Sequence, residues 1–274
     1  MINFKTKKTL VMGVINITPD SFSDGGKYNT LEKALLHAKQ LINDGADILD
    51  VGGESTRPFS KPVSLEEELD RVIPVIENLK KITEIPISID TNKAVVAKKA
   101  LFAGASIIND ISAMTFDPKM ADVASQSNCP IILMHMLGTP ENMQNNPLYT
   151  DLFDELLKFF KERIQYSLKK GIKKENIILD PGIGFGKTLE HNLLIIKNLE
   201  ILSNLELPVL IGTSRKTFIR KLVKKDDLPN DKDVVTGSVA SVCAGVLNGA
   251  KIVRVHDVKE TKAALKIIDA LKNV

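Results

Sequence analysis

Eight short apolar segments alternate with helical patterns along the chain, and a polar residue stands at or just after the end of each segment. The segments are rich in Val, Ile and Leu without strict alternation, which is typical of parallel strands covered on both faces. They span residues 10–17, 46–51, 85–89, 106–108, 130–134, 176–179, 208–211 and 251–255. The polar residues at their ends are Asn16, Asp50, Asp90, Asn109, His135, Asp180, Ser214 and His256. Because the carboxyl ends of parallel barrel strands share one face, these residues are predicted to line one pocket.

The alternation of strands and helices predicts the α/β class with a parallel sheet, and eight repeats favour its closure into a (β/α)8 TIM barrel. The chain has 274 residues, and such a barrel typically needs about 250. Pro86, Pro130 and Pro208 stand at strand starts, where a missing N–H is tolerated. An open doubly wound sheet is the alternative on pattern alone. No linker, low-complexity segment or change of composition divides the chain, so residues 1–274 are predicted to form one domain.

Several residues mark where predicted helices begin or bend. Ser64 and Glu67 have the spacing of a capping box, in which each side chain bonds the backbone N–H of the other residue. Pro74 lies within the helical pattern that follows and predicts a kink. Asp257 and Glu260 are placed to cap the last helix.

Three connections after strands are unusually long, at about 17–29, at about 52–63, and from His135 to about Thr150. The first two contain Pro, Gly and Ser, which are typical of turns rather than of helices or strands. Long loops at the mouth of a barrel often close over a ligand. The first two loops are therefore candidate mobile lids.

Composition narrows the classes of partner and compartment. Lys and Arg total 37 against 34 Asp and Glu, which leaves a net charge of +3 with no block of like charge. Nucleic-acid binding normally needs a concentrated basic face, so no nucleic-acid partner is expected. Cys129 and Cys243 show neither metal nor redox spacing, which favours a reducing compartment. No signal-peptide pattern and no apolar run near the roughly 18 residues of a membrane span is found, so a cytoplasmic protein with no membrane partner is expected.

The glycine-rich stretch 180–188 has the composition of a nucleotide-binding loop but not its spacing. A phosphate-binding P-loop needs Gly where Pro181 stands, and the dinucleotide-binding pattern is missed by one position. Phe185 is instead predicted to project from a flexible rim and to cover a flat ligand. The alternative is an ordinary strand-to-helix turn with an exposed Phe.

Acidic and amide side chains at three strand ends favour a heterocyclic ligand. Asp90 and Asp180, with Asn109 between them in barrel order, offer acceptors and an amide to a ring with several N–H and C=O groups. Asp50 is followed by Val-Gly-Gly-Glu and is instead expected to cap a helix or to bond a neighbouring strand. No His–x–His or His–Glu–x–x–His spacing exists, so these carboxylates do not predict a metal cluster.

A second group of residues, near the last two strands, predicts an anion site. Residues 213–216 (Thr-Ser-Arg-Lys) follow the seventh strand, and Arg254 and His256 lie two residues apart on the eighth, facing the same side. A hydroxyl, a backbone N–H at a helix start and cationic or protonatable side chains suit a phosphate or diphosphate. The alternative for any one of them is a solvent-facing salt bridge.

The other histidines are weaker candidates for function. His37 lies in a helical pattern and His191 near a helix start, and both are expected to be structural or solvated. His135 ends a strand, but Met134 beside it is equally suited to contact a ligand through apolar atoms.

Two long motifs, together with several shorter ones, give the chain a resemblance to a known family. They are residues 16–26 (Asn-Ile-Thr-Pro-Asp-Ser-Phe-Ser-Asp-Gly-Gly) and 52–58 (Gly-Gly-Glu-Ser-Thr-Arg-Pro). Shorter motifs lie at 88–91, 108–110, 133–135, 180–187, 214–216 and 254–257. With these motifs the chain resembles the dihydropteroate synthase family of the folate pathway over almost its whole length. No departure falls at a position where the function of that family resides.

The resemblance implies a TIM barrel that joins 6-hydroxymethyl-7,8-dihydropterin diphosphate to 4-aminobenzoate, releasing diphosphate and 7,8-dihydropteroate. It also implies Mg²⁺ and a homodimer. A dissociative course, in which diphosphate leaves before the amine attacks, suits the residues found. The amine of 4-aminobenzoate is an adequate nucleophile when neutral, and no strong catalytic base stands out in the sequence.

The resemblance further implies roles for single residues. The pterin ring is expected to be held by Asp90, Asn109, Asp180 and Lys216, with Met134 and Ile111 as apolar walls. The diphosphate is expected to meet Asn16, Arg254 and His256, with Asn16 also near the Mg²⁺. The aminobenzoate is expected beside Thr56, Arg57, Pro58, Phe185 and Ser214, with Phe22 of the first loop closing over it. The residues expected to act in catalysis are Asp90, Lys216, Arg254 and His256.

Two other functions remain open at this level. A pterin-binding methyltransferase barrel shares the Asp and Asn pocket but transfers a methyl group to a corrinoid, and both long loop motifs argue against it. A catalytically silent pterin-binding protein tolerates the loss of the lids, which are intact in this sequence.

Overall fold

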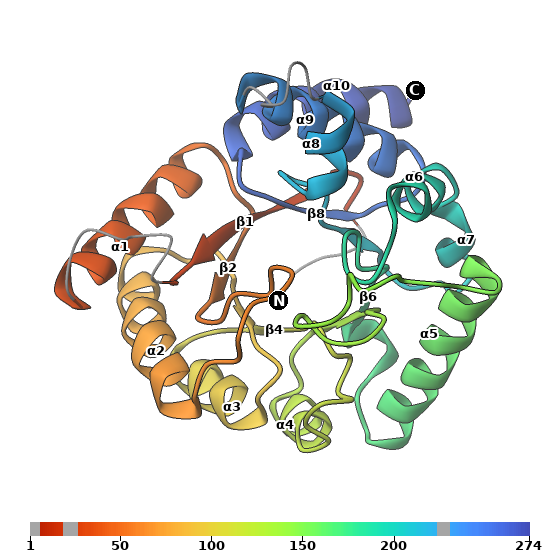
Figure 1. Ribbon diagram of the computed structural model, residues 1–274. Helices are drawn as coiled ribbons and strands as arrows, with labels where there is room; N and C mark the ends of the chain where they lie inside the picture. Colours follow the sequence, from red (N-terminus) through yellow and green to blue (C-terminus); the bar gives the residue numbers. More distant parts are fainter. Residues whose placement is uncertain (1–5, 19–26, 224–230) are drawn as a thin grey trace.

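The apolar segments form one closed parallel sheet in the computed structural model, which describes residues 6–18, 27–223 and 231–274. Eight strands pair in the order β6-β5-β4-β3-β2-β1-β8-β7, and a parallel bridge between Leu179 and Val209 joins the two edges. The predicted (β/α)8 barrel is confirmed, with its helices outside the sheet (Figure 1), and the open doubly wound alternative is wrong. The strands are β1 Leu10–Asn16, β2 Ile48–Gly52, β3 Ile87–Asp90, β4 Ile107–Asp110, β5 Ile131–Met134, β6 Ile177–Asp180, β7 Leu210–Ile211 and β8 Ile252–Val255.

Helices connect the strands on the outside of the barrel. They are α1 Lys27–Asn43, α2 Leu65–Ile82, α3 Ala94–Ala103, α4 Met120–Ser127, α5 Leu152–Lys169, the 3-10 helix η2 Lys174–Asn176, α6 Leu189–Lys197, α7 Glu200–Ser203, α8 Thr217–Val223, α9 Asp231–Leu247 and α10 Val258–Lys272. The helix α2 runs unbroken through Pro74. Among the described helices, none combines the length and the apolar character needed to cross a membrane.

Proline precedes three of the strands, as predicted. Pro86 and Pro130 stand directly before β3 and β5, and Pro208 stands two residues before β7. Proline has no N–H to donate but keeps its carbonyl as an acceptor. The three carbonyl oxygens accept from the backbone N–H groups of Leu49, Ile108 and Leu179 at 3.0, 2.9 and 2.9 Å, respectively. Each proline thus stands just before its strand, and its carbonyl still accepts a hydrogen bond from the neighbouring strand.

The inside of the barrel is built in layers that follow the two-residue period of the strands. One layer is a cluster of buried apolar side chains. Its members are Met12, Ile48, Ile107, Ile132, Ile178, Leu210 and Ile252. Two residues further along the same strands stand Val14, Asp50, Asn109, Met134, Asp180, Gly212 and Arg254. The next inward-facing layer toward the carboxyl ends of the strands is therefore largely polar, whereas the layer below it is apolar.

This layering corrects the predicted place of Asp50. The residue lies in the middle of β2, which continues to Gly52, and not at the end of the strand. Its neighbours in register are Val14 on β1 and Ser88 on β3. Asp50 is completely buried, so its carboxylate depends on partners inside the barrel.

The helix starts confirm only part of the predicted capping. Ser64 Oγ accepts from the Glu67 N–H at 3.2 Å, but the Glu67 carboxylate bonds Arg71 instead of returning to Ser64. Asp257 stands at the N-cap of α10 without a side-chain cap bond, because its carboxylate bonds Arg215. In both cases the carboxylate forms an ion pair with an arginine in place of the predicted bond to a backbone N–H.

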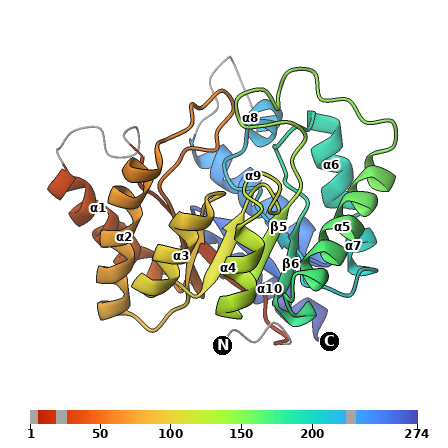
Figure 2. The ribbon, with the colours of Figure 1, turned by 90° about the horizontal axis from the view of Figure 1, so that it is seen from below.

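The loops after β2 and β5 lie at one end of the barrel, and the C-terminus lies at the other (Figure 2). The predicted first lid falls largely outside the described residues. The loop after β2 contacts the loop after β5 through a bond from the Phe59 N–H to the Pro140 carbonyl at 2.9 Å. These two loops therefore form one connected rim on the side where the polar layer opens.

The turn after β6 requires glycine at one position in particular. Gly182 has φ +68°, and a Cβ built on it would lie 1.9 Å from the His135 carbonyl oxygen. Its N–H donates to Asp180 Oδ1 at 2.7 Å. The absence of a side chain therefore lets the β6 turn pack directly against the end of β5 while its backbone holds the Asp180 carboxylate.

We expect Gly182→Ala to lower the free energy of unfolding by about 2 kcal/mol or more, because a left-handed backbone and a clash with main chain add together. Urea unfolding at neutral pH measures this. The control is Gly212→Ala, whose new Cβ would find its nearest atom, Arg254 Cβ, at 3.7 Å. The control should lose less than about 1 kcal/mol. Equal losses in both variants would contradict the steric explanation.

Candidate active site

A buried ion cluster joins strands from opposite parts of the sequence at the polar layer. Arg254 Nε lies 2.6 Å from Asp50 Oδ2, and Arg254 Nη2 lies 2.8 Å from Asp90 Oδ2. Asn109 Nδ2 donates to the same Asp50 oxygen at 3.2 Å. The expected bond from Asp50 to a neighbouring strand is wrong: β2 lies between β1 and β3, and the partners of Asp50 belong to β8 and β4, the strands beyond them. The cluster orders the side chains of Asp90, Asn109 and Arg254 around one centre.

Asp180 and Lys216 complete the polar wall on the opposite side. The Asp180 side chain is held by the Gly182 N–H. Lys216 follows β7, and its Nζ lies 3.9 Å from the centroid of the Phe185 ring. An ammonium over an aromatic face is attracted by the ring quadrupole. The wall therefore presents one carboxyl group and one cation that is fixed above an aromatic ring.

Burial shifts the ionisation of these groups toward neutrality. It raises the pKa of Asp90 to about 7, while the nearby Arg254 opposes the shift and Asp50 adds to it. Burial likewise raises the pKa of Asp180 to about 6, against the bond from Gly182. The pKa of Lys216 falls to about 8 because of burial and the charge of Arg254. Such perturbed groups gathered in one cavity are typical of a functional site.

An apolar patch lies beside the polar wall. Ile111, Met134, Met143 and Phe185 are buried together, and Met136 packs against them. Phe185 is 8% exposed, so the alternative of an exposed Phe in an ordinary turn is wrong, and so is the projection from a flexible rim. Flat apolar surfaces beside fixed hydrogen-bonding groups suit a planar heterocycle.

Ser214 and His256 form a polar pair at the end of the cavity near β8. Ser214 Oγ lies 3.1 Å from His256 Nδ1 and accepts from the His256 N–H at 3.2 Å. Burial, with the charges of Arg254 and Arg215, lowers the pKa of His256 to about 3. Near neutral pH the ring is therefore neutral and offers a hydrogen bond instead of a charge.

Arg215 differs from its predicted place in the anion site. Its Nε donates to Asp257 Oδ2 at 3.0 Å, and its Nη2 lies 2.5 Å from Asp257 Oδ1. The side chain is 44% exposed. For this residue the alternative of a solvent-facing salt bridge is confirmed, so Lys216 and Arg254 are the half-buried cations of the predicted anion group.

These groups open into one cavity of about 900 Å³. Every described residue to which the resemblance assigned a role lines it, although the role of each stays a prediction, whereas Asp50 and His135, two of the eight strand-end residues predicted to line one pocket, do not. These lining residues are Asn16, Thr56, Arg57, Pro58, Asp90, Asn109, Ile111, Met134, Asp180, Phe185, Ser214, Lys216, Arg254 and His256. Phe22, the remaining predicted residue, lies outside the described residues.

Lys187 lines the cavity but was not among the predicted site residues. Its Nζ lies 3.0 Å from His135 Nδ1 and 3.0 Å from the Phe185 carbonyl. Burial lowers the pKa of Lys187 to about 7. Because it joins the turn after β6 to the end of β5, it holds the backbone that carries Phe185. Its place directly after Gly186 in a motif was the only sequence signal for it.

The remaining histidines are structural. His135 packs edge-on against Phe159 with ring centroids 4.8 Å apart, and burial lowers its pKa to about 2. His37 Nε2 lies 3.1 Å from the Val14 carbonyl. His191 forms a capping box with Thr188 at the start of α6, which confirms the expected structural role.

A closed (β/α)8 barrel with buried acceptors, an amide and a lysine around an apolar slot defines a binding site for a planar nitrogen heterocycle. The sequence matches the family described as pterin binding enzyme over residues 12–256. The chain belongs to this family of pterin-binding enzymes.

Within that family the similarity is to dihydropteroate synthases. The chain is 52% identical to the dihydropteroate synthase of Bacillus subtilis over 267 residues, which cover 97% of this chain and 90% of that protein. The Xanthomonas albilineans dihydropteroate synthase structure with 4-aminobenzoic acid has a TM-score of 0.91 at 42% identity, covering 100% of this chain and 96% of that one. The structure of the same organism's enzyme in complex with 7,8-dihydropteroate has a TM-score of 0.88 at 41% identity, with the same coverage.

Proposed function

We propose that this protein is a transferase that condenses 6-hydroxymethyl-7,8-dihydropterin diphosphate with 4-aminobenzoate, giving 7,8-dihydropteroate and diphosphate for folate biosynthesis. One observation carries the proposal. A single cavity in a pterin-binding family member is lined both by the heterocycle-binding group and by Thr56, Arg57 and Pro58 of the loop after β2. Structures of similar enzymes with 4-aminobenzoic acid and with 7,8-dihydropteroate support one substrate and the product of this reaction.

The pterin ring lies in the deepest part of the cavity in this proposal. Asp90, Asn109 and Asp180 offer acceptors and an amide to its N–H and C=O groups, and Lys216 closes the polar edge. Met134 and Ile111 form the apolar face. The support is that all these side chains line one cavity.

The diphosphate lies toward Asn16, Arg254 and His256. The guanidinium of Arg254 uses Nε and Nη2 for its two carboxylate bonds, and a guanidinium has five N–H donors in all. It is therefore able to bind phosphate oxygens without leaving Asp50 and Asp90. Neutral His256, oriented by Ser214, adds a hydrogen bond.

The donor set fits a Mg²⁺ ion held mainly by the substrate. Mg²⁺ usually binds through one or two protein oxygens together with substrate phosphates and water. Among the described residues, no group of three or more His, Cys, Asp and Glu is arranged to hold a metal, and the amide of Asn16 lines the cavity. Asn16 is the residue proposed to hold the ion, which when bound compensates the charge of the leaving diphosphate.

The reaction proceeds by departure of diphosphate from the pterin methylene carbon, followed by attack of the aminobenzoate amine. Arg254 compensates the developing negative charge, and an ionised Asp90 stabilises the delocalised cation left on the pterin. The amine attacks as a neutral nucleophile, so a strong base is not needed. The loops exclude water, which otherwise competes for the cation.

The aminobenzoate lies nearer the mouth of the cavity. Thr56, Arg57 and Pro58 approach it from the loop after β2, while Phe185 and Ser214 approach it from the barrel. The proposed closing residue of the first loop, Phe22, is outside the described residues. The exposed guanidinium of Arg57 suits the carboxylate of this substrate.

A homodimer and a cytoplasmic location are part of the same proposal. Exposed leucines on α6 and α9, Leu193, Leu194 and Leu247, supply apolar surface for a second copy. Cys129 and Cys243 are free thiols, which fits a reducing compartment.

The direct test of the reaction is an assay with both substrates and Mg²⁺. We expect one diphosphate released for each 7,8-dihydropteroate formed, and no release without 4-aminobenzoate beyond slow hydrolysis. Binding of the pterin diphosphate without turnover would support the silent pterin-binding alternative. Methyl transfer to a corrinoid in place of diphosphate release would support the methyltransferase alternative.

The raised pKa of Asp90 predicts the pH dependence of kcat/KM. The ionised carboxylate is required, so activity should rise with pH through about 7. Protonated Lys216 is also required, so activity should fall as pH passes about 8. The expected profile is a bell between these values.

Asp90→Asn should lower turnover about 100-fold, because the removed charge acts mainly in the transition state. Affinity for diphosphate should change far less, and the acidic limb near pH 7 should disappear. The control is Asp122→Asn, a 54% exposed residue paired with Lys170 outside the cavity. An acidic limb that persists unchanged in Asp90→Asn contradicts the role of Asp90.

A further inference from the structure

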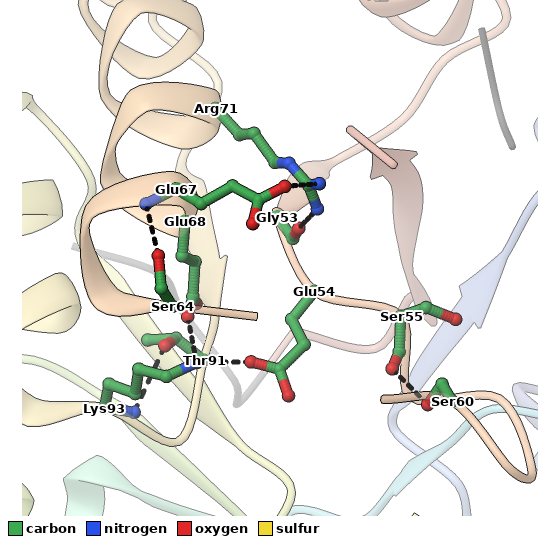
Figure 3. A network of polar contacts seen from close by, with 10 residues as sticks. All are labelled: Gly53, Glu54, Ser55, Ser60, Ser64, Glu67, Glu68, Arg71, Thr91 and Lys93. Atoms are coloured by element: carbon green, nitrogen blue, oxygen red, sulfur yellow. Dashed lines mark hydrogen bonds and ion pairs between the residues drawn. The ribbon is translucent and has the colours of Figure 1, made fainter. Parts of the chain in front are cut away.

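A buried cluster of three charged side chains lies behind the loop that follows β2 (Figure 3). Lys93 Nζ lies 2.5 Å from Glu68 Oε2 and also bonds the Glu54 carboxylate. Each residue comes from a different element. Glu68 lies in the first turn of α2, Lys93 is the N-cap of α3, and Glu54 belongs to the loop. The lysine therefore connects the loop to two helices of the barrel.

Burial makes this connection difficult to break. The Glu68 side chain is 1% exposed, that of Glu54 15% and that of Lys93 24%. Among the described residues, none bonds Glu68 Oε1, so Lys93 is the cation that offsets this buried carboxylate. Although burial lowers the pKa of Lys93, its hydrogen bonds to the two carboxylates outweigh that effect and raise the pKa. The ammonium thus stays charged, and losing it leaves a buried carboxylate uncompensated.

A parallel contact supports the residue just before Glu54. Glu67, next to Glu68 in α2, bonds Arg71, whose Nη1 donates to the Gly53 carbonyl at 2.7 Å (Figure 3). Two successive loop residues are therefore each held by a cation that a carboxylate of α2 orients. This arrangement fixes the direction in which the chain leaves β2.

The cluster adjoins the reaction cavity. Glu54 lines the large cavity next to Thr56 and Arg57. Glu54, Glu68 and Asp90 also line a small cavity of about 10 Å³ behind it. Lys93 follows β3, the strand that ends in Asp90, by three residues and bonds the loop through Glu54.

We propose that Lys93, oriented by Glu68, is a positioning residue that holds Glu54 and so places Thr56, Arg57 and Pro58 against the aminobenzoate. The inference rests on the proposed function and deepens it. Lys93 touches neither substrate. It acts on acceptor binding through the loop, and it is not among the residues that line the cavity.

The test measures the Michaelis constants of both substrates in Lys93→Met and Glu54→Ala. We expect the KM for 4-aminobenzoate to rise about tenfold or more in both, because the loop loses its charged anchor. The KM for the pterin diphosphate should stay within about twofold. Glu54→Ala leaves the buried Glu68–Lys93 pair intact, so it reports on the loop even if Lys93→Met fails to fold. Lys93→Arg, which keeps the cation, should restore much of the acceptor binding.

The matched control is Lys80→Met, which removes an exposed lysine paired with Glu84 on the outer surface of α2. It should leave both constants unchanged. Equal rises for the two substrates, or unchanged constants in folded Glu54→Ala, would overturn the positioning role. A wild-type protein that forms no dihydropteroate would instead overturn the proposed function, so the two failures are distinguishable.

Discussion

The ion cluster of Arg254 with Asp50 and Asp90 is the interaction on which the rest of the site depends. It sits directly above the apolar layer of the barrel and is formed by three separate strands. Removing one partner of such a buried pair typically costs about 3–5 kcal/mol, because the other charge is left without compensation. The cluster therefore constrains both the barrel and the cavity. These charged side chains can be buried only if the strands bring them to the same layer of the barrel, where they compensate one another.

The polar layer explains why a site forms here rather than elsewhere in the barrel. Inward positions alternate along each strand, so moving two residues from the apolar layer reaches Asp50, Asn109, Asp180 and Arg254. Burial at that level moves the pKa of Asp90 up to about 7 and that of Lys216 down to about 8. Groups with a pKa near neutral pH change their protonation readily when a charged ligand binds. This property suits a site where an anion leaves and a cation forms.

The barrel and the composition of the cavity were predictable from the sequence because both follow from local periodicity. Apolar strand segments predicted the sheet, and polar residues at their ends predicted the residues that line the cavity. Pairing was not predictable from the sequence. Arg215 bonds Asp257, and Lys93 bonds Glu68, across separations that no local pattern encodes. The burial of Phe185 likewise depends on Lys216 and on methionines from another loop. Several residues of the sequence are chemically equivalent partners for each of these side chains. Which of them forms the contact depends on which lies nearest in the folded structure.

In the proposed reaction, the polar layer around Arg254 binds the pterin and its departing anion at once. A crystal structure with 6-hydroxymethyl-7,8-dihydropterin diphosphate tests it most directly. We expect the ring between Asp90, Asn109, Asp180 and Lys216, with the diphosphate directed toward Asn16, Arg254 and His256. A ring bound at the outer rim beside Arg220 and Lys221, with the Arg254 cluster out of contact, would contradict it.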